Sequence, residues 1–260
     1  MTHVIDLQDV SWRRQQKTIL TDINWSVEKG EHWAVLGLNG SGKTSLLNIV
    51  TGYSWPTVGH ARILDKPFGQ VDIRELRKSI GWVSSSLQER FKASERAEDI
   101  VVSGKFASIG LSYEAPTPSD FDKAFHIMEQ MRCRHLAGRT YQTCSQGERQ
   151  KLLIARGLMA SPELLLLDEP TSGLDFIARE ELLSAIQELI KQDDAPTIIF
   201  VTHHIEEVLP EFSHTLLLKD GTIFAKGVSQ DVLATGSLSR FFDRPVHVEW
   251  HHERPWLSLR

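Results

Sequence analysis

The stretch GLNGSGKT, from Gly37 to Thr44, has residue types and spacing that could hold a phosphate group. It fits the pattern G-x-x-x-x-G-K-[ST], and it lies between a predicted strand and a predicted helix, a context that makes the pattern specific. Glycines allow backbone N–H groups to approach an anion, and the following helix presents the positive end of its dipole. We expect Lys43 to reach the β- and γ-phosphates of a nucleotide and the Thr44 hydroxyl to bind Mg²⁺. The predicted contact residues are Gly37, Leu38, Asn39, Gly40, Ser41, Gly42, Lys43, Thr44 and Ser45.

A second stretch, LLLLDEP from Leu164 to Pro170, places two adjacent carboxylates at the end of a short apolar run. Such a run is typical of a strand buried in a parallel sheet. Asp168 would then be a direct or outer-sphere partner of Mg²⁺. Glu169 would point toward an attacking water and polarise it as a general base.

The third stretch, CSQGE from Cys144 to Glu148, reads as the polar start of a helix that continues as LLIARGL. Ser145 followed three residues later by Glu148 is a capping box, in which each side chain takes a backbone N–H at the helix start. The same helix start could instead hold an anion. Local sequence alone leaves both alternatives open.

The elements that must position these residues alternate between strands and helices. Strand, helix, strand, helix, strand is the pattern of an α/β fold with a mostly parallel sheet. The helix predicted at 176–192 places Ile177, Leu182, Ile186 and Leu189 on one face. Residues 87–160 have more helical periodicity, which predicts a helical lobe there. The other predicted elements are strands at 3–10, 17–27, 31–37, 164–168 and 197–203, a helix at 43–50, a helix opened by Ser145, and a hairpin turn at 219–222.

Composition narrows the class of protein. The 260 residues carry a formal net charge of −5, which argues against a nucleic-acid binder. The chain has two cysteines, Cys133 and Cys144, which suits a reducing cytosol and offers no disulfide framework. The start, MTHVIDLQDV, does not read as a signal peptide. The longest apolar runs are far shorter than the ~20 residues of a membrane span, so we expect any membrane connection to run through a partner.

In their order and spacing these stretches resemble the ATP-binding cassette ATPases over nearly the whole chain. In that family a signature helix start, matched here by CSQGE, lies between the phosphate loop and the acidic strand end. The family's D-loop is matched by SGLD at 172–175, its switch histidine by His203, and its adenine-stacking aromatic residue by Trp12. The resemblance implies a P-loop NTPase fold of the α/β class with a mostly parallel sheet core, an N-terminal antiparallel β subdomain and an inserted helical lobe. It implies one domain over residues 1–260, with the lobe at about 87–160 and a C-terminal extension at about 226–260.

The resemblance also implies an activity and partners. The chain would bind MgATP and hydrolyse ATP to ADP and phosphate, with His203 holding the γ-phosphate and the attacking water beside Glu169. Two copies would form a homodimer, head to tail around two ATP molecules, so that each signature faces the ATP of the other copy. The residues expected at that face are Ser145, Gln146, Gly147, Glu148 and Asp175. An integral membrane transporter subunit would be the other partner, and the chain would lie in the cytoplasm at the inner face of the cell membrane.

Three departures from the family pattern fall in the signature: Cys144 replaces leucine, Gln146 replaces a glycine and Glu148 replaces glutamine. Glu148 adds a negative charge near an anion, so we expect weaker binding of the partner's ATP. A further departure lies in IGWVSSSLQERF, where the family has a glutamine that contacts Mg²⁺. Either Gln88 reaches the metal from a shifted loop, or Ser85 is a weaker metal ligand.

Histidines near the C-terminus offer another alternative. His247, His251 and His252 could form a metal cluster, but HVEWHHERPW also reads as an alternating strand that ends in an aromatic contact, and we favour the strand. His204, next to the switch histidine, is expected to face solvent.

Two functions fit the sequence. The first is the energising subunit of a membrane transporter, and the second is a soluble regulatory cassette acting on a macromolecular partner. The SSS loop and the C-terminal HVEWHHERPWL resemble a small group of cassettes linked to molybdenum transport or photorepair.

Overall fold

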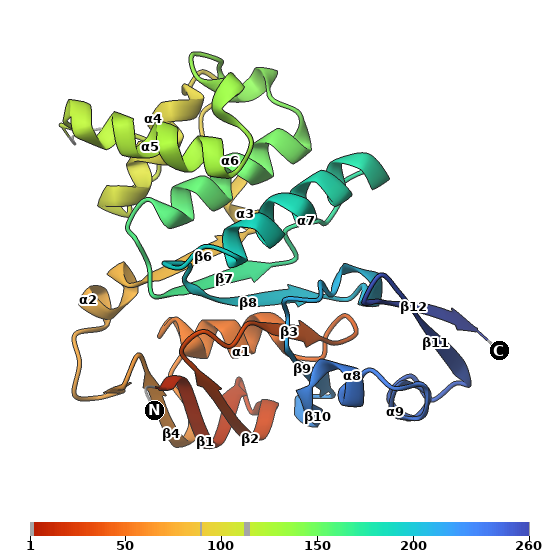
Figure 1. The fold of residues 1–260 in the computed structure, drawn as a ribbon. Coiled ribbons are helices and arrows are strands. Elements are labelled where there is room, and N and C mark those ends of the chain that lie inside the picture. Colours follow the sequence, from red (N-terminus) through yellow and green to blue (C-terminus); the bar gives the residue numbers. More distant parts are fainter. Residues whose placement is uncertain (1–2, 89, 112–114, 260) are drawn as a thin grey trace. The chain divides into compact units, whose positions relative to one another are not determined.

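The computed structural model describes residues 3–88, 90–111 and 115–259, without the side chains of residues 85 and 86. The chain divides into two compact units. The first joins the N-terminal part, up to Arg77, to the C-terminal part from Thr197 onward, and the second runs from Lys78 to Pro196. Figure 1 shows the elements of both units along the chain.

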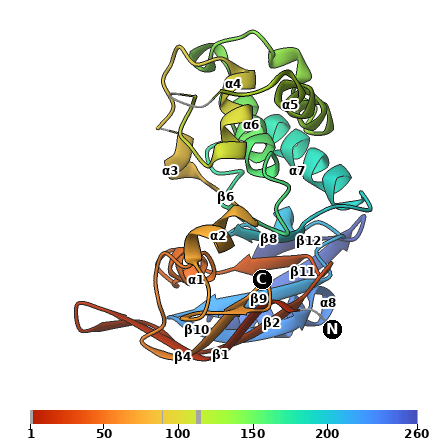
Figure 2. The ribbon, with the colours of Figure 1, turned by 90° about the vertical axis from the view of Figure 1, so that its left-hand side faces the viewer.

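The first unit begins with an antiparallel sheet whose strands follow the order β2-β1-β4-β5. Ile23, Trp25 and Val27 alternate as buried residues along β2, which is typical of a sheet with one face on a core, whereas register shifts interrupt the alternation along β1. Figure 2 shows β1, β2 and β4 as neighbouring ribbons. The strands are β1 (His3–Arg14), β2 (Lys17–Glu28), β4 (Val58–Ile63) and β5 (Lys66–Pro67).

The same unit holds the strands that carry the phosphate loop. β3 (Trp33–Leu36) is buried at every position and pairs in parallel with β8 (Thr197–Thr202) on one side and β9 (His214–Lys219) on the other. β10 (Thr222–Val228) returns antiparallel to β9 through a turn in which Asp220 and Gly221 have φ of 49° and 76°. This left-handed pair makes the predicted hairpin turn. The helix after β3 is α1 (Lys43–Val50).

The remaining elements of the first unit are short. Arg254 of the C-terminal hairpin donates to the carbonyl of Glu206, in the 3-10 turn after β8. These elements are α2 (Ile73–Lys78), α8 (Ser229–Val232), α9 (Thr235–Phe241), β11 (Val246–His251) and β12 (Arg254–Leu259).

The second unit pairs two parallel strands and surrounds them with helices. β6 (Ile80–Ser84) pairs in register with β7 (Leu164–Asp168), and every residue of β7 is buried. Gly157 and Gly81 allow close packing here, because a Cβ on Gly81 would lie 2.9 Å from the carbonyl oxygen of Gly157. The helices are α3 (Ser85–Gln88), α4 (Ala97–Ser103), α5 (Pro118–Gln130), α6 (Gln146–Leu158) and α7 (Phe176–Ile190).

The fold confirms the predicted α/β class with a mostly parallel core and an antiparallel N-terminal sheet. One detail of the sequence prediction is wrong. Leu182, Ile186 and Leu189 are buried on one face of α7. Ile177 is 64% exposed, and its neighbour Phe176 is 60% exposed. The first turn of α7 thus presents two large apolar side chains to solvent. Within the described ranges no helix is long and apolar enough to cross a bilayer.

The pairing of β1 with β4 depends on a glycine. Gly59 has φ of +89°, and it faces an irregularity of β1 between Gln8 and Ser11. A Cβ on Gly59 would overlap the backbone carbonyl of Asp9. Gly30 has a similar φ of +84°, but no atom lies within 4 Å of the place where its Cβ would be.

We therefore expect Gly59→Ala and Gly30→Ala to differ sharply in stability. Gly30→Ala pays only for the left-handed backbone, about 1 kcal/mol of the free energy of unfolding, whereas Gly59→Ala adds backbone overlap and should cost at least about 3 kcal/mol. Urea unfolding of both variants and the parent chain measures this difference. Equal losses would show that the contact with Asp9 is not a constraint on the sheet.

Candidate functional site

The phosphate loop is closed tightly in the first unit. Gly40 and Gly42 have φ of +80° and +107°, values that L side chains rarely adopt. A Cβ on Gly37 would overlap the Ser41 hydroxyl and would lie 2.7 Å from the carbonyl oxygen of Leu218 in β9. The glycines of this loop are therefore required by backbone conformation and by contact with β9.

Polar groups within this loop are prepared for an anion. The ammonium of Lys43, a buried residue, donates to the carbonyl oxygen of Gly37 at 2.8 Å, so the cation lies within the curl of the loop. The hydroxyl of Ser41 is buried and finds no hydrogen-bond acceptor or donor in the described part of the chain. Gly42, at the N-cap of α1, supplies no side-chain cap, and no acidic residue occupies the first turn. Backbone N–H groups at such a helix start favour a bound phosphate, so the residues fit a nucleotide.

Other predicted nucleotide contacts lie on or beside this loop. Thr44 is exposed on the first turn of α1, and Ser45 follows it half-buried. Trp12 is half-buried on β1, opposite Leu20 of β2. The Cβ position of Gly42 is 2.9 Å from the Leu20 side chain. The strand pair that carries Trp12 is thus in direct contact with the loop, as an adenine-stacking residue requires.

The acidic strand end lies in the second unit. Asp168 ends the buried strand β7 and is itself 9% exposed. Glu169 follows with φ of 49°, a left-handed conformation that is uncommon for a residue with a Cβ. Backbone strain of this kind costs about 1–3 kcal/mol and is concentrated at functional positions. Ser172 N–H donates to the carbonyl of Glu169, so the chain turns sharply after it.

The switch histidine lies at the end of β8, in the first unit. His203 is exposed, and its ring centre is 4.1 Å from that of His204. The Thr202 hydroxyl accepts the His204 N–H at 3.0 Å and donates to the Glu207 carboxylate, which fixes the turn after β8. The His204 side chain is 44% exposed, so it partly faces solvent as expected, with a ring nitrogen 3.5 Å from Glu206; His203 is the more exposed of the two.

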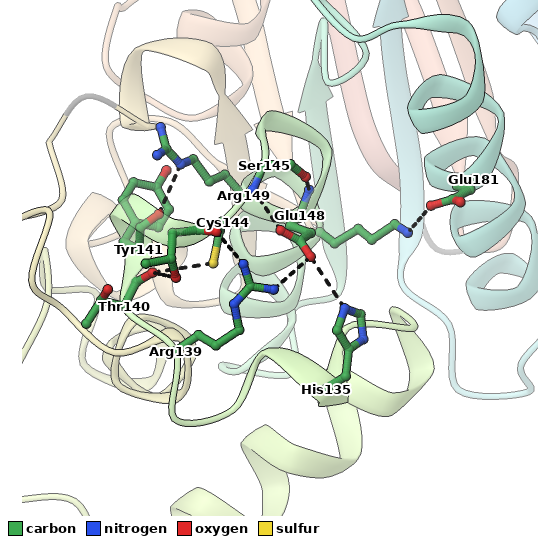
Figure 3. A network of polar contacts seen from close by, with 11 residues as sticks. His135, Arg139, Thr140, Tyr141, Cys144, Ser145, Glu148, Arg149 and Glu181 are labelled. Carbon is green, nitrogen blue, oxygen red and sulfur yellow. Dashed lines mark hydrogen bonds and ion pairs between the residues drawn. The ribbon is translucent and has the colours of Figure 1, made fainter.

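The capping box at the signature is present in full (Figure 3). Glu148 N–H donates to the Ser145 hydroxyl at 3.3 Å, and the Glu148 carboxylate accepts the Ser145 N–H at 2.7 Å. The local explanation of this polar helix start is therefore confirmed.

The negative charge of Glu148 is balanced by the Arg139 guanidinium. Its carboxylate lies 3.1 Å from an Arg139 guanidinium nitrogen and 3.5 Å from a His135 ring nitrogen. Figure 3 draws both contacts as dashed lines. Partial burial by itself raises the pKa of Glu148. The Ser145 N–H bond, the Arg139 charge and the His135 contact outweigh burial, so the pKa is lowered. Glu148 is thus an ion-paired carboxylate, so the negative charge that it adds at the helix start is partly balanced within the chain.

Two further residues of the signature are explained by packing. A Cβ on Gly147 would lie 3.1 Å from the Cβ of Ala178, so a larger residue would press the start of α6 against the first turn of α7. Cys144 is buried, which raises the pKa of its thiol, and the thiol donates to the carbonyl oxygen of Thr140 at 3.6 Å. The glycine in this helix start therefore has a structural reason that needs no ligand.

Gln146 makes a contact that sequence reasoning missed. Its side-chain amide donates to the carbonyl oxygen of Ser172 at 3.1 Å, within the SGLD stretch. Asp175 ends that stretch and caps α7 by accepting the Ala178 N–H at 2.9 Å. The only sequence signal for this contact is the replacement of a family glycine by a side chain with a donor.

The expected metal ligands are placed unequally. Gln88 is half-buried as the last residue of α3, and the side chain of Ser85 lies outside the described residues, so the choice between the two stays open. The C-terminal histidines lie on or next to β11, as the strand prediction requires, and His247 and His251 both contact Glu249. Over the described ranges, no group of three or more histidine, cysteine or acidic side chains is arranged to hold a metal ion.

Comparison with known proteins identifies the family of this chain. A protein-family model described as "ABC transporter" matches residues 20–172. The uncharacterized ABC transporter ATP-binding protein YlmA of Bacillus subtilis is 48% identical over 256 residues, which cover 98% of this chain and 97% of YlmA. The chain belongs to the ABC transporter family.

Two other members of the family are informative. The molybdate import ATP-binding protein MolC of Haemophilus influenzae is 30% identical, with 95% of this chain and 90% of MolC covered. This match agrees with the resemblance to the molybdenum group of cassettes. A solved structure of a putative metal-chelate type ABC transporter, in an inward-facing conformation, superposes with a TM-score of 0.78 at 27% identity, covering 98% of this chain and 96% of that chain.

Membership in the ABC transporter family decides between the two hypotheses of function. The chain is an ATP-binding cassette that hydrolyses ATP and energises a transporter. The fold is the P-loop NTPase fold, as predicted.

The ion pair at the signature generates a pH-dependent prediction for Glu148→Gln, which restores the residue typical of the ABC transporter family. Glutamine preserves the capping box but loses the attraction of Arg139. The folded-state pKa of Glu148 is depressed, so its stabilisation is complete above the ordinary pKa of 4.5 and is lost as the pH falls through the folded value.

At neutral pH we expect Glu148→Gln to lower the free energy of unfolding by about 0.5–1 kcal/mol, a modest loss because the pair is partly solvated. Chemical unfolding of the parent chain and of Glu148→Gln, from neutral pH down to about pH 3, measures the difference in their free energies of unfolding. This difference should shrink in the acid range, where the Glu148 carboxyl is protonated and uncharged like the glutamine amide. Arg139→Met is the matched variant and should reduce the same pH dependence, leaving the part that the Ser145 N–H and His135 contribute. A constant difference at every pH would exclude the ion pair as its cause.

Proposed function

We propose that two copies of the chain close head to tail around two MgATP molecules, hydrolyse them, and pass the resulting motion to an integral membrane subunit. The observation that carries the nucleotide part is the phosphate loop, in which Lys43 lies inside a glycine-rich curl followed by an uncapped helix start. ATP would lie along Gly37–Ser45, with its adenine on Trp12. These residues all belong to the first unit.

Mg²⁺ would be held by oxygen ligands on the nucleotide and the chain. The exposed Thr44 hydroxyl and the Asp168 carboxylate are the hard oxygen donors that this ion prefers, and the Gln88 side chain is the third candidate. When bound, the ion neutralises charge that develops on the β- and γ-phosphate oxygens.

Glu169 would act as the general base. Its carboxylate takes a proton from water as the water oxygen bonds to the γ-phosphorus, and the bond from that phosphorus to the ADP oxygen breaks with its electron pair. His203, exposed at the end of β8, would donate a hydrogen bond to the γ-phosphate and orient the water. The place of Glu169 supports this role, because it directly follows the buried strand β7 where the chain turns.

The signature would complete the site of the other copy. Ser145, Gln146, Gly147, Glu148 and Asp175 lie at or beside the starts of α6 and α7, where backbone N–H groups attract phosphate. The capping box satisfies the start of α6 without ATP, and Ser145 would exchange its intrahelical contact for the γ-phosphate of the partner. Exposed Phe176 and Ile177 on the first turn of α7 favour a protein surface that another protein covers.

The membrane subunit is inferred from the relatives. Proteins named as ABC transporter ATP-binding proteins match nearly the whole chain. A cassette of this kind would sit on the cytoplasmic side of the membrane, where ATP is available, and dock on the inner face of its transporter.

Replacement of Glu169 by glutamine tests this mechanism. Glutamine has the size of the carboxylate but cannot take the proton, so ATP binding should survive while turnover falls by roughly 10²–10⁴-fold. The ATP-bound dimer should persist, since the step that opens it is blocked. Phosphate release and size-exclusion chromatography with MgATP measure the two effects.

Glu163→Gln is the matched control, since Glu163 is exposed just before the other end of β7 and its change removes the same charge. It should hydrolyse ATP at the parent rate. Near-normal hydrolysis by Glu169→Gln would move the general base to another residue, and loss of ATP binding would give Glu169 a structural or metal role instead.

A further inference from the structure

Gln146 connects the start of α6 to the segment that follows β7, and both lie in the second unit. It is the first residue of α6, directly after Ser145, and its amide nitrogen is 3.1 Å from the carbonyl oxygen of Ser172. The same nitrogen would be 2.6 Å from a Cβ on Gly173, which has φ of +75°. The amide therefore lies against the bare backbone of Gly173, a position that a side chain on residue 173 would block.

The segment that Gln146 touches is short and begins at Glu169. The chain turns twice, since Ser172 N–H donates to the carbonyl of Glu169 and Leu174 N–H donates to the carbonyl of Thr171. It ends at Asp175, whose carboxylate caps α7. We call residues 169–175 the acidic loop. Its ends are held by β7 and by α7, and Gln146 holds its middle.

The start of α6 is fixed to the same elements from a second direction. Gly147 packs on Ala178 in the first turn of α7, where a Cβ on the glycine would lie 3.1 Å from the Ala178 Cβ. A helix start that contacts both the acidic loop and α7 cannot shift without moving them.

We propose that Gln146 is a positioning residue for ATP hydrolysis, tying the helix start that carries Ser145 to the acidic loop that begins at Glu169. The inference rests on the proposed function and adds to it, because it gives Gln146 a role in the geometry of its own chain beside its place at the face toward the partner's ATP. In a chain with glycine at this position the acidic loop lacks this bond. Here the loop and the helix start approach the second copy as one surface.

Gln146→Met tests the bond most cleanly. Methionine has similar length and no charge but offers no N–H donor. Loss of a neutral hydrogen bond should speed amide exchange in residues 172–174 by about threefold to tenfold, and should lower kcat by a similar factor with KM for ATP within about twofold. Hydrogen exchange followed by mass spectrometry and steady-state phosphate release measure these two quantities.

Gln130→Met is the matched control. The Gln130 amide donates to the side-chain oxygen of Gln192 at 2.9 Å, so this variant loses the same kind of bond in the same unit but away from the acidic loop. It should leave exchange in residues 172–174 and kcat at the parent values. Equal effects of the two variants would overturn the proposal, and so would faster exchange with an unchanged kcat in Gln146→Met.

The outcome is separable from that of the proposed function. Glu169→Gln, measured in parallel, reports on the general base alone. If Glu169→Gln is inactive and Gln146→Met behaves as the parent chain, only the positioning role fails. If Glu169→Gln hydrolyses ATP normally, the proposed mechanism fails whatever Gln146→Met does.

Discussion

Backbone N–H groups at the start of a helix need a partner, and the chain meets this need in opposite ways at two helices. The start of α1 has Gly42 at its N-cap and no acidic residue in its first turn, so no side chain caps its backbone N–H groups and an anion can bind them. The start of α6 is closed by its own side chains, because Ser145 and Glu148 exchange hydrogen bonds in a capping box. The start of α1 thus leaves its backbone N–H groups for a phosphate, whereas the start of α6 is satisfied by its own side chains.

The three replaced residues of the signature CSQGE are explained by their contacts within the chain. Each replaced residue has a contact in its own chain: Cys144 is buried, Gln146 donates to Ser172 and Glu148 pairs with Arg139. The added carboxylate therefore places little uncompensated charge at the helix start. The departures from the family pattern add contacts between the start of α6 and its neighbours. They leave in place Ser145 and Gly147, the residues nearest the expected phosphate.

Sequence reasoning succeeded where the signal is local. The helix at 43–50, the buried strand at 164–168 and the hairpin turn at 219–222 follow from glycine spacing and runs of apolar residues, and the structure confirms them. The capping box was also readable, because both of its members lie within one turn. Strand order was not readable, since the pairing of β3 with β8 and β9 joins residues far apart in the chain.

The missed features all depend on contacts across the fold. Ile177 fits the apolar face of α7 by spacing, but nothing in the described residues covers that first turn. The need for glycine at 147 comes from Ala178, and the partner of Gln146 is Ser172, neither of which spacing can reveal. The left-handed backbone at Glu169 was equally hidden, because its residue type does not favour that conformation.

We propose that the start of α6 serves ATP bound to a second copy. The most direct measurement is the ATP-dependent dimerisation of Ser145→Arg, made in the Glu169→Gln chain so that bound ATP persists, and followed by sedimentation velocity with MgATP. We expect this double variant to bind ATP as tightly as Glu169→Gln alone but to remain a monomer, because arginine would fill the place of the partner's γ-phosphate. The same substitution at Ser258, exposed on β12, should leave the dimer intact. A dimer of normal stability with arginine at position 145 would contradict the account and reduce CSQGE to a helix cap.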